Sequence, residues 1–307
     1  MGGGKAKVII IGGPTATGKT EVAISLAEAL DGEIINADSM QVYRHMDIGT
    51  AKPGPEQRAL IPHHMLDVVD PDESFNASLY RSMALPLIEK IASKGKVPIV
   101  VGGTGLYIKI LRGGLFSCPA ADPELRRKLA LEYDQLGALA LYKKLEEIDP
   151  EAAARIHPND KIRVTRALEI YQLTGKRPSD LARGHGFKDR PFNDLMFCLY
   201  LDREELYSRI NRRCVRMIEE GLIDETRKLL EKGYSPELKP MQAIGYRHVT
   251  RYILGHWPLE EAIRQMQKDT RRYAKRQITW FKGEKEFIWL KPDQFEILLK
   301  RSEGFLC

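Results

Sequence analysis

The apolar positions near the start of the chain form a continuous run and not an alternating one. Residues 7–11 read Lys-Val-Ile-Ile-Ile and lead into Gly12-Gly13. A β-branched run of this kind is typical of a strand that is buried on both faces of a parallel sheet. From Lys19, apolar residues recur at helical spacing until Asp31-Gly32 ends the pattern. We therefore predict a strand over residues 7–11 and a helix after it.

Two more short apolar runs have the same character. Residues 33–37 form the second predicted strand, which delivers Asp38-Ser39-Met40-Gln41 to its carboxyl end. Residues 97–101 form the third, and Gly102-Gly103-Thr104-Gly105 leads from it into another helix. Strands separated by helices predict an α/β fold, a parallel sheet flanked by helices that binds its ligands at the carboxyl ends of the strands.

The pattern changes after Cys118. From Asp122 to about Gly186 the apolar residues recur at helical spacing, and no segment has a convincing strand pattern. Sheet character returns at residues 195–201, and Asp202 opens a long helical stretch. A last short strand is predicted over residues 287–290. We predict a core of residues 1–117 and 190–307, with basic helices near its C-terminus, and an inserted all-helical subdomain of residues 118–189.

Composition narrows the class of protein. The chain of 307 residues is 43% hydrophobic and 29% charged, which is typical of a globular protein and excludes whole-chain disorder. Its apolar runs are far shorter than the roughly 20 residues that span a bilayer, so we expect no membrane partner. The four cysteines lie far apart without a CxxC pair, which predicts neither a zinc ribbon nor a disulfide framework. We expect a monomer in the reducing cytoplasm.

The turn after the first strand carries a complete phosphate-binding motif. It matches G-x-x-x-x-G-K-[ST] with Gly13, Pro14, Thr15, Ala16, Thr17, Gly18, Lys19 and Thr20. Its glycines let backbone N–H groups surround phosphate oxygens, Lys19 supplies a positive charge, and the Thr20 hydroxyl can hold Mg²⁺. The motif lies between a predicted strand and a predicted helix, which favours phosphate binding over a coincidental glycine-rich turn. The loop predicts phosphate, not a particular reaction.

An acidic residue is missing where a P-loop nucleotidase or kinase needs one to organise Mg²⁺. The strand over residues 97–101 ends in two glycines, and the carboxylate that ends a core strand at this face is that of Asp38. Its neighbours Ser39, Gln41 and Tyr43 are hydrogen-bonding groups suited to a polar substrate. We predict that Asp38 is a general base, and the alternative is an aspartate that caps the next turn.

Three further features have ordinary structural interpretations. Gly102-Gly103-Thr104-Gly105 fits a tight turn between strand and helix, and it lacks the dinucleotide pattern G-x-G-x-x-G. His63-His64 has no third ligand at a useful spacing, so a polar loop pair is favoured over a metal site. Asp122 before Pro123 predicts the beginning of a helix.

The positive charge of the chain is concentrated near its C-terminus. The net charge is +6, and residues 264–282 alone contain seven basic residues against Asp269. On a helix, one side carries Arg264, Lys268, Arg271, Arg272 and Lys275. The other side carries Ile263, Met266, Thr270, Ala274, Gln277 and Phe281. A solvated charged face normally mixes signs, so we predict that this basic stripe binds nucleic acid through its phosphates.

Seven segments together resemble the tRNA dimethylallyltransferase family. They are residues 13–20, Asp38-Ser39-Met40-Gln41, Gly49-Thr50-Ala51-Lys52-Pro53, residues 102–107, residues 157–169 with His157-Pro158-Asn159-Asp160 and Arg166-Ala167-Leu168-Glu169, residues 242–246 and residues 272–281. They follow one another in the family's order over nearly the whole chain. Any one segment is modest support, but seven in register are highly specific.

The resemblance implies a P-loop NTPase-like core with an inserted helical subdomain. It implies transfer of a dimethylallyl group from dimethylallyl diphosphate to N6 of adenosine 37, beside the anticodon in the tRNA anticodon stem-loop. The loop would then hold a pyrophosphate leaving group, with Mg²⁺ on Thr20, instead of hydrolysing ATP. The motif is nonetheless a nucleotide-binding one, and the sequence leaves open whether ATP also binds. The chain resembles the compact bacterial form, without the zinc finger of eukaryotic relatives.

The resemblance also implies roles for particular residues. Asp38 matches the base, Arg209 an arginine at the diphosphate, and Thr104 a position that is both catalytic and in contact with tRNA. The residues that match tRNA-contact positions, together with those of the basic stripe, are Asp38, Ser39, Met40, Gln41, Thr104, Arg126, Ile162, Arg163, Val164, Thr165, Arg166, Gln242, Gly245, Arg271, Arg272 and Lys275.

Two other classes of function stay open on the residues alone. A P-loop kinase for a small acceptor would need no basic stripe and would need the missing acidic strand end. A non-catalytic RNA-binding module would need no complete phosphate loop beside Asp38. Transfer of label from dimethylallyl diphosphate to unmodified tRNA separates all three.

Overall fold

The chain is described by a computed structural model that covers residues 4–116 and 122–307. It forms two compact units, one of residues up to 112 together with 190–307 and one of residues 113–189. The predicted domain boundary between residues 117 and 118 lies outside the described residues. Hydrogen bonds within each unit hold the residues at which the chain passes from one unit to the other. Within the smaller unit the Asp189 N–H donates to the Gly113 carbonyl (3.3 Å), and within the larger one Arg112 Nε donates to Asp194 (2.7 Å).

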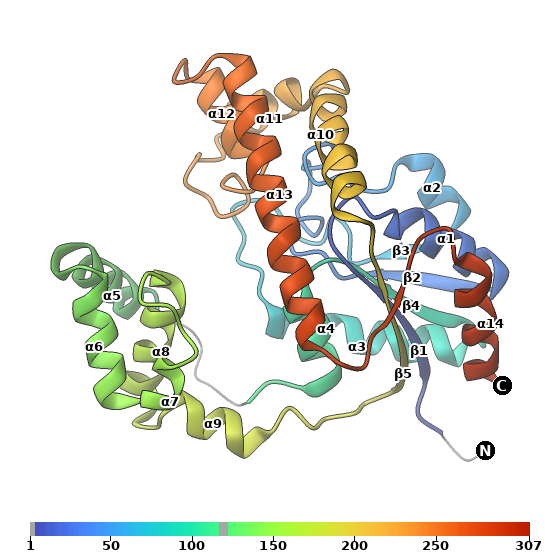
Figure 1. Ribbon diagram of the computed structural model, residues 1–307, viewed down its shortest axis with the longest axis horizontal. Helices are drawn as coiled ribbons and strands as arrows, with labels where there is room; N and C mark the ends of the chain where they lie inside the picture. Colours follow the sequence, from blue (N-terminus) through green and yellow to red (C-terminus); the bar gives the residue numbers. More distant parts are fainter. Residues whose placement is uncertain (1–3, 117–121) are drawn as a thin grey trace. The chain divides into compact units, whose positions relative to one another are not determined.

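The larger unit is built on a parallel sheet (Figure 1). In the described residues it has six strands in the order β3-β2-β4-β1-β5-β6. Their bounds are β1 Lys7–Gly12, β2 Gly32–Asn36, β3 His63–His64, β4 Val97–Val101, β5 Asn193–Leu199 and β6 Ile288–Leu290. The central strand β1 is hydrogen-bonded on both sides, with Ile10 opposite Val100 and Met196. The predicted parallel α/β sheet is confirmed, and the continuous apolar run has the position that its pattern indicated.

Two strands differ from the sequence prediction. His63-His64 is a short edge strand beside β2 and not a loop pair, and His64 Nε2 lies 2.7 Å from the buried Glu33 carboxylate. Strand β5 begins at Asn193, two residues before its predicted start, because Asn193 and Asp194 pair with the first residues of β1. In both cases the partner strand determines the pairing, although the local residues are polar.

Helices cover both faces of this sheet. One face packs against α1 (Lys19–Ala29) and α14 (Phe295–Leu306), and the other packs against α3 (Ala77–Ser93), α4 (Gly105–Gly113) and α13 (Leu259–Gly283). The remaining helices of this unit are α2 (Pro55–Leu60), α10 (Arg203–Glu219), α11 (Leu222–Glu231) and α12 (Tyr246–Ile253). Helix α13 contacts both α10 and α12 (Figure 1). No helix of the described residues is long and apolar enough to cross a membrane.

The smaller unit has only helices in its described residues, 113–116 and 122–189. They are α5 (Pro123–Leu136), α6 (Ala138–Ile148), α7 (Pro150–Ala153), α8 (Lys161–Thr174) and α9 (Pro178–His185). Leu129, Leu141, Leu145, Val164 and Leu168 form a core of their own. Asp122 caps α5 as predicted, since its carboxylate accepts the N–H groups of Glu124 (2.9 Å) and Leu125 (3.0 Å).

A close backbone approach explains the glycine that follows β4. A Cβ atom at Gly102 would lie 2.2 Å from the Ala37 carbonyl oxygen, immediately before Asp38. We expect Gly102→Ala to lower the free energy of unfolding by about 1–3 kcal/mol, because the clash is with backbone. Denaturant unfolding measures this, and Gly283→Ala is the control because nothing lies within 4 Å of a Cβ there. Equal stability of the two variants would contradict the close approach.

Candidate active site

A cavity of about 1830 Å³ lies in the larger unit at the carboxyl ends of the central strands. Its lining includes the phosphate loop, the residues that follow β2, Gly102-Gly103, residues between 239 and 247, helix α10 and helix α13. Thr20, Asp38, Arg209, Gln242 and Lys19 all contribute to its wall. The topology thus brings the loop motif and the candidate base to one place, as expected for the carboxyl edge of a parallel sheet.

The backbone of the phosphate loop has the conformation that its glycines permit. Gly13 and Gly18 have positive φ angles of 136° and 82°, and helix α1 begins immediately after Gly18, at Lys19. A Cβ atom at Gly13 would also lie 2.4 Å from the Leu199 carbonyl oxygen of β5. Within the loop, the Thr17 hydroxyl (2.8 Å) and Lys19 Nζ (2.7 Å) both donate to the Pro14 carbonyl. The loop is therefore closed on itself and holds Lys19 at the cavity.

Two cations share the space beside this loop. Burial and, to a smaller extent, the nearby Arg213 together lower the pKa of Lys19 to about 8, against the opposing effect of Asp38. Arg213 donates from Nη1 to the Thr15 hydroxyl (3.2 Å), and burial lowers its pKa as well. Two desolvated positive charges beside backbone N–H groups favour binding of a multivalent anion such as a diphosphate.

The arginine in contact with the phosphate loop is not the one that the sequence indicated. Arg209 lines the cavity, but its guanidinium is paired with Glu205 one turn earlier in α10 (2.8 Å). Arg213 lies one turn later on the same face and contacts the loop. The spacing of four residues was the available signal, because it places both arginines on one side of a helix.

Asp38 caps the turn that follows β2, and its second carboxylate oxygen is not used for the cap. Its Oδ1 accepts the N–H groups of Met40 (2.8 Å) and Gln41 (3.4 Å), which makes it the cap of the following turn. Its Oδ2 has no hydrogen-bond partner among the described residues. The Thr104 hydroxyl accepts the Ser39 N–H (3.0 Å) and thereby holds the same turn from the β4 side. One carboxylate oxygen is fixed by the fold, and the other is free to accept a proton.

Two neighbours of Asp38, Tyr43 and Gln41, have structural contacts in the fold. Tyr43 is fully buried, and burial raises the pKa of its hydroxyl. The Gln41 side-chain amide donates to the carbonyls of Thr50 (3.0 Å) and Ala51 (3.1 Å). Ser39 and Met40 are half-buried and line the cavity. The prediction that Tyr43 contacts a polar substrate is wrong, because the chain folds over this residue.

A buried glutamine links the phosphate loop to the loop after β4. Gln277 of α13 accepts the Thr15 N–H at Oε1 (2.9 Å) and donates from Nε2 to the Gly103 carbonyl (3.0 Å). The sequence pattern placed Gln277 on the packing side of the helix and gave no sign of this contact. A lone polar residue among apolar packing positions was the signal, since buried amides nearly always have hydrogen-bond partners.

The basic stripe of α13 is less continuous than its sequence indicates. The packing side is confirmed, with Met266, Ala274, Gln277 and Phe281 buried. On the other side, Arg264 pairs with Glu261 (2.7 Å) and Arg272 with Asp269 (3.4 Å), while Arg271 donates to Asn211 (2.5 Å).

Over its full length, helix α13 has a smaller excess of positive charge than residues 264–282 alone. It begins at Leu259, so Glu260 and Glu261 belong to it, and it has seven basic against three acidic residues. Lys268 and Lys275 are exposed and have no ion pair within the part of the chain that the structure describes.

Two other predicted tRNA-contact residues belong to the larger unit. Gln242 lines the cavity, and its side-chain amide donates to the Pro236 carbonyl (2.7 Å). Gly245 is buried with a φ of 100°, and its N–H donates to His248 Nδ1 (3.3 Å) immediately before α12. Gly245 therefore sets the backbone course into α12, and Gln242 is the member of this pair with an exposed side chain at the cavity.

Two of the predicted tRNA-contact residues of the smaller unit, Arg126 and Arg166, bind the same buried carboxylate. The Glu169 carboxylate is fully buried and receives hydrogen bonds from Arg126 (2.8 Å) and Arg166 (2.6 Å). Burial raises the pKa of Glu169, but these bonds outweigh burial and lower it overall. Each arginine is therefore held by a charge of opposite sign.

Residues 162–166 begin helix α8, and its turns separate their side chains. Ile162 is 81% exposed and Arg163 is exposed beside Asp160, whereas Val164 is 0% exposed. Thr165 donates its hydroxyl to the Lys161 carbonyl (2.6 Å). The prediction of Val164 as a tRNA-contact side chain is wrong, because its helical phase places it in the core of this unit.

The residues present could hold a metal ion only together with a substrate. The described residues contain no group of three His, Cys, Asp or Glu side chains arranged to bind one. Thr20 and Asp38 contribute oxygen atoms to the same cavity. This set fits Mg²⁺, which keeps several waters and binds through one or two protein oxygens and substrate phosphates.

Comparison with known proteins identifies the family. Residues 41–284 match the model of the IPP transferase family, and residues 6–61 match that of the isopentenyl transferases. The chain belongs to the IPP transferase family. The tRNA dimethylallyltransferase of Syntrophobacter fumaroxidans is 51% identical over 92% of this chain and 82% of its own. That of Geobacter sulfurreducens is 51% identical over 96% and 95%.

Solved structures of IPP transferases extend the similarity to the fold. The tRNA isopentenylpyrophosphate transferase of Bacillus halodurans is 42% identical, with a TM-score of 0.74 over 98% of this chain and 97% of its own. A eukaryotic dimethylallyltransferase, described as acting on tRNA, is 33% identical, with a TM-score of 0.76 over 94% of this chain and 74% of its own. The resemblance seen in the sequence is confirmed. The chain is an enzyme, a prenyltransferase with a P-loop NTPase-like core.

Proposed function

We propose that this IPP transferase moves the dimethylallyl group of dimethylallyl diphosphate to N6 of adenosine 37, beside the tRNA anticodon, and releases diphosphate. The names of its relatives support transfer to tRNA. The observation that carries the proposal is one cavity lined by the phosphate loop with Lys19, by Arg213, and by Asp38. Anion-binding groups and a carboxylate base in one cavity suit a reaction that expels a diphosphate and removes a proton.

The phosphate end of the donor binds at the loop. Backbone N–H groups of the loop, Lys19 and Arg213 surround the diphosphate, with Arg209 beside them on α10. Cleavage of the allylic C–O bond builds negative charge on the leaving group, and preorganised cations stabilise that charge as it forms. The Thr20 hydroxyl would hold Mg²⁺, which when bound would supply further positive charge to stabilise the leaving diphosphate.

The acceptor base meets the donor near Asp38. An adenine inside a stacked loop hides its amine, so the nucleotide is flipped into the cavity at a cost of a few kcal/mol. The N6 lone pair forms a bond with C1 of the dimethylallyl group, the C–O bond breaks, and its electron pair leaves with the diphosphate. Asp38 accepts the N6 proton at Oδ2. Thr104 holds the turn that carries Asp38, and this contact is its contribution to catalysis.

Labelled dimethylallyl diphosphate and unmodified tRNA test the proposed reaction. We expect label in the RNA and one diphosphate released for each adenosine modified. The same incubation with labelled ATP in place of the donor should leave both RNA and small acceptors unphosphorylated. Phosphorylation without prenyl transfer would overturn the proposal in favour of a kinase. We expect the enzyme to act as a cytoplasmic monomer.

Lys268 and Lys275, two exposed lysines of the basic stripe, should contribute to tRNA binding. Lys268 and Lys275 lie on the exposed side of the helix, so they are free to contact phosphates. Replacing both by glutamate should weaken tRNA binding and reduce the slope of log K against log salt by about 1 for each phosphate that the variant no longer neutralises. Binding measured at several salt concentrations checks this. A matched change at Arg264, which pairs with Glu261, should have a smaller effect, and equal effects would contradict the assignment.

A further inference from the structure

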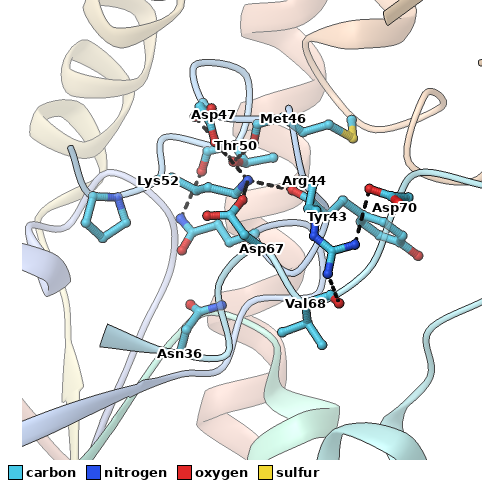
Figure 2. A network of polar contacts seen from close by, with 12 residues as sticks. Asn36, Tyr43, Arg44, Met46, Asp47, Thr50, Lys52, Asp67, Val68 and Asp70 are labelled. Atoms are coloured by element: carbon cyan, nitrogen blue, oxygen red, sulfur yellow. Dashed lines mark hydrogen bonds and ion pairs between the residues drawn. The ribbon is translucent and has the colours of Figure 1, made fainter. Parts of the chain in front are cut away.

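Lys52 lies at the centre of a network of polar contacts in the segment that follows β2 (Figure 2). Its side chain is 1% exposed, and Nζ donates to the Tyr43 carbonyl, to Asp47 Oδ1 (2.8 Å) and to Asp67 Oδ1 (2.7 Å). The three protons of the ammonium group thus have three acceptors, which compensates its burial. Asp67 receives a second bond, from Arg58 (2.7 Å). No step of the proposed reaction uses this lysine, although it belongs to the segment Gly49-Thr50-Ala51-Lys52-Pro53.

The contacts of Lys52 close the loop of residues 38–52, called the Asp38 loop below. Lys52 binds the backbone at Tyr43, and the Gln41 side chain binds the carbonyls of Thr50 and Ala51, so both ends of the loop are joined. The Gln41 and Met40 N–H groups in turn bind Asp38 Oδ1. Hydrogen bonds of Lys52 and Gln41 therefore hold the loop whose N–H groups bind the carboxylate of the candidate base.

The far end of the Asp38 loop is bound to a different part of the larger unit. The Glu225 carboxylate of α11 accepts the N–H groups of Asp47 (3.0 Å), Ile48 (2.9 Å) and Gly49 (3.1 Å). The Tyr246 hydroxyl of α12 donates to the same carboxylate (2.6 Å). Glu225 thus fixes the outer end of the Asp38 loop, and Lys52 joins the segments that lead into and out of that end, so we expect loss of Lys52 to shift the loop next to Asp38.

We propose that Lys52 is a positioning residue for the reaction, acting through Asp38. This proposal rests on the proposed function, because that function gives Asp38 the role of base. Lys52 keeps the Asp38 loop closed, and the closed loop presents the two N–H groups that hold Oδ1. Oδ2 is thereby left as the oxygen that accepts the proton. Displacement of a reacting group by about 1 Å can slow a reaction by about 100-fold.

A double-mutant cycle separates this role from a general loss of structure. Lys52→Met should lower the single-turnover transfer rate by about 10- to 100-fold and leave the KM for dimethylallyl diphosphate within about twofold, because the phosphate loop is untouched. In an Asp38→Asn background the same change should have at most about a threefold effect, since the base is already gone. Lys52→Arg, which keeps the charge, should recover part of the rate.

Arg112→Met is the matched control for loss of a buried cation. Arg112 is also buried and paired with two carboxylates, Asp194 and Glu286, but has no contact with the Asp38 loop. We expect comparable loss of thermal stability with an unchanged transfer rate. If Lys52→Met does not fold, Asp67→Asn makes the milder change at the same ammonium and should show the same dependence on Asp38.

Each outcome has a distinct meaning. Equal losses from Lys52→Met in the wild-type and Asp38→Asn backgrounds, or an unchanged rate, would overturn the positioning role. A rise in KM with an unchanged rate would also overturn it. A wild-type enzyme that transfers no dimethylallyl group would instead overturn the proposed function.

Discussion

Replacement of Asp38 by asparagine is expected to lower the rate of dimethylallyl transfer by about 10²- to 10⁴-fold, the usual contribution of a general base. Asparagine keeps an acceptor oxygen for the N–H groups of Met40 and Gln41, so the turn is preserved while the proton acceptor is lost. Binding of tRNA and of the donor should change little. Single-turnover rates together with tRNA binding measure the two effects separately.

Asp31→Asn is the control for this change. Asp31 precedes the opposite end of β2, and its side chain is 79% exposed beside Lys96. That variant should transfer at the wild-type rate. Undiminished transfer by Asp38→Asn would show that the proton leaves by another route, and loss of tRNA binding without loss of rate would make Asp38 a binding residue only.

Replacement of Lys19 by methionine should have the second large effect. The ammonium group is buried at the loop, and in the proposed reaction the charge of the departing diphosphate develops beside it. Removal of one preorganised donor of this kind lowers rates by about 10²- to 10³-fold. We expect a fall in kcat/KM for dimethylallyl diphosphate with little change in tRNA affinity. Steady-state kinetics with each substrate varied in turn would reveal it, and an unchanged kcat/KM would exclude Lys19 from the diphosphate site.

The lowered pKa of Lys19 adds a pH dependence to this prediction. The free enzyme loses the Lys19 proton as the pH rises through about 8, and the neutral amine attracts a diphosphate less strongly. Affinity for the donor should therefore be highest below about pH 8 and fall above it. Lys19→Arg, which stays protonated, should remove this dependence. Equal pH profiles for both forms would contradict the assignment of the titration to Lys19.

The sequence predicted those parts of the site that a local pattern carries. The phosphate loop and Asp38 stand directly after predicted strands, and parallel strands end at one edge of a sheet, so their proximity followed from the topology. Arg213 and Gln277 were missed because their roles depend on which element packs beside them. Arg213 differs from Arg209 only by one turn of α10, and Gln277 was counted among packing residues.

The predictions that the structure contradicts have different physical origins. Residues 264–282 do not include the acidic first turn of α13, which contains Glu260 and Glu261. Val164 was grouped with its neighbours in the chain, although helical phase separates it from Ile162 and Arg163. His63 pairs with β2 as an edge strand because its partner supplies the hydrogen bonds. Of these, only the pairing of His63 depends on a three-dimensional neighbour, because helix starts and helical phase are local features of the chain.

The neck of the helical insertion has a consequence for how the chain can vary. The N–H of Asp189 is bonded to the carbonyl of Gly113, and Arg112 and Asp194 are paired on the core side. The insertion therefore begins and ends at adjacent residues. Its length affects the free energy of unfolding of the core only through the entropy of loop closure, and each doubling of the length costs about 0.6 kcal/mol. A segment attached in this way can grow, shrink or be exchanged between lineages without altering a strand register. The length of the insertion can thus change while the strands that carry the cavity keep their positions.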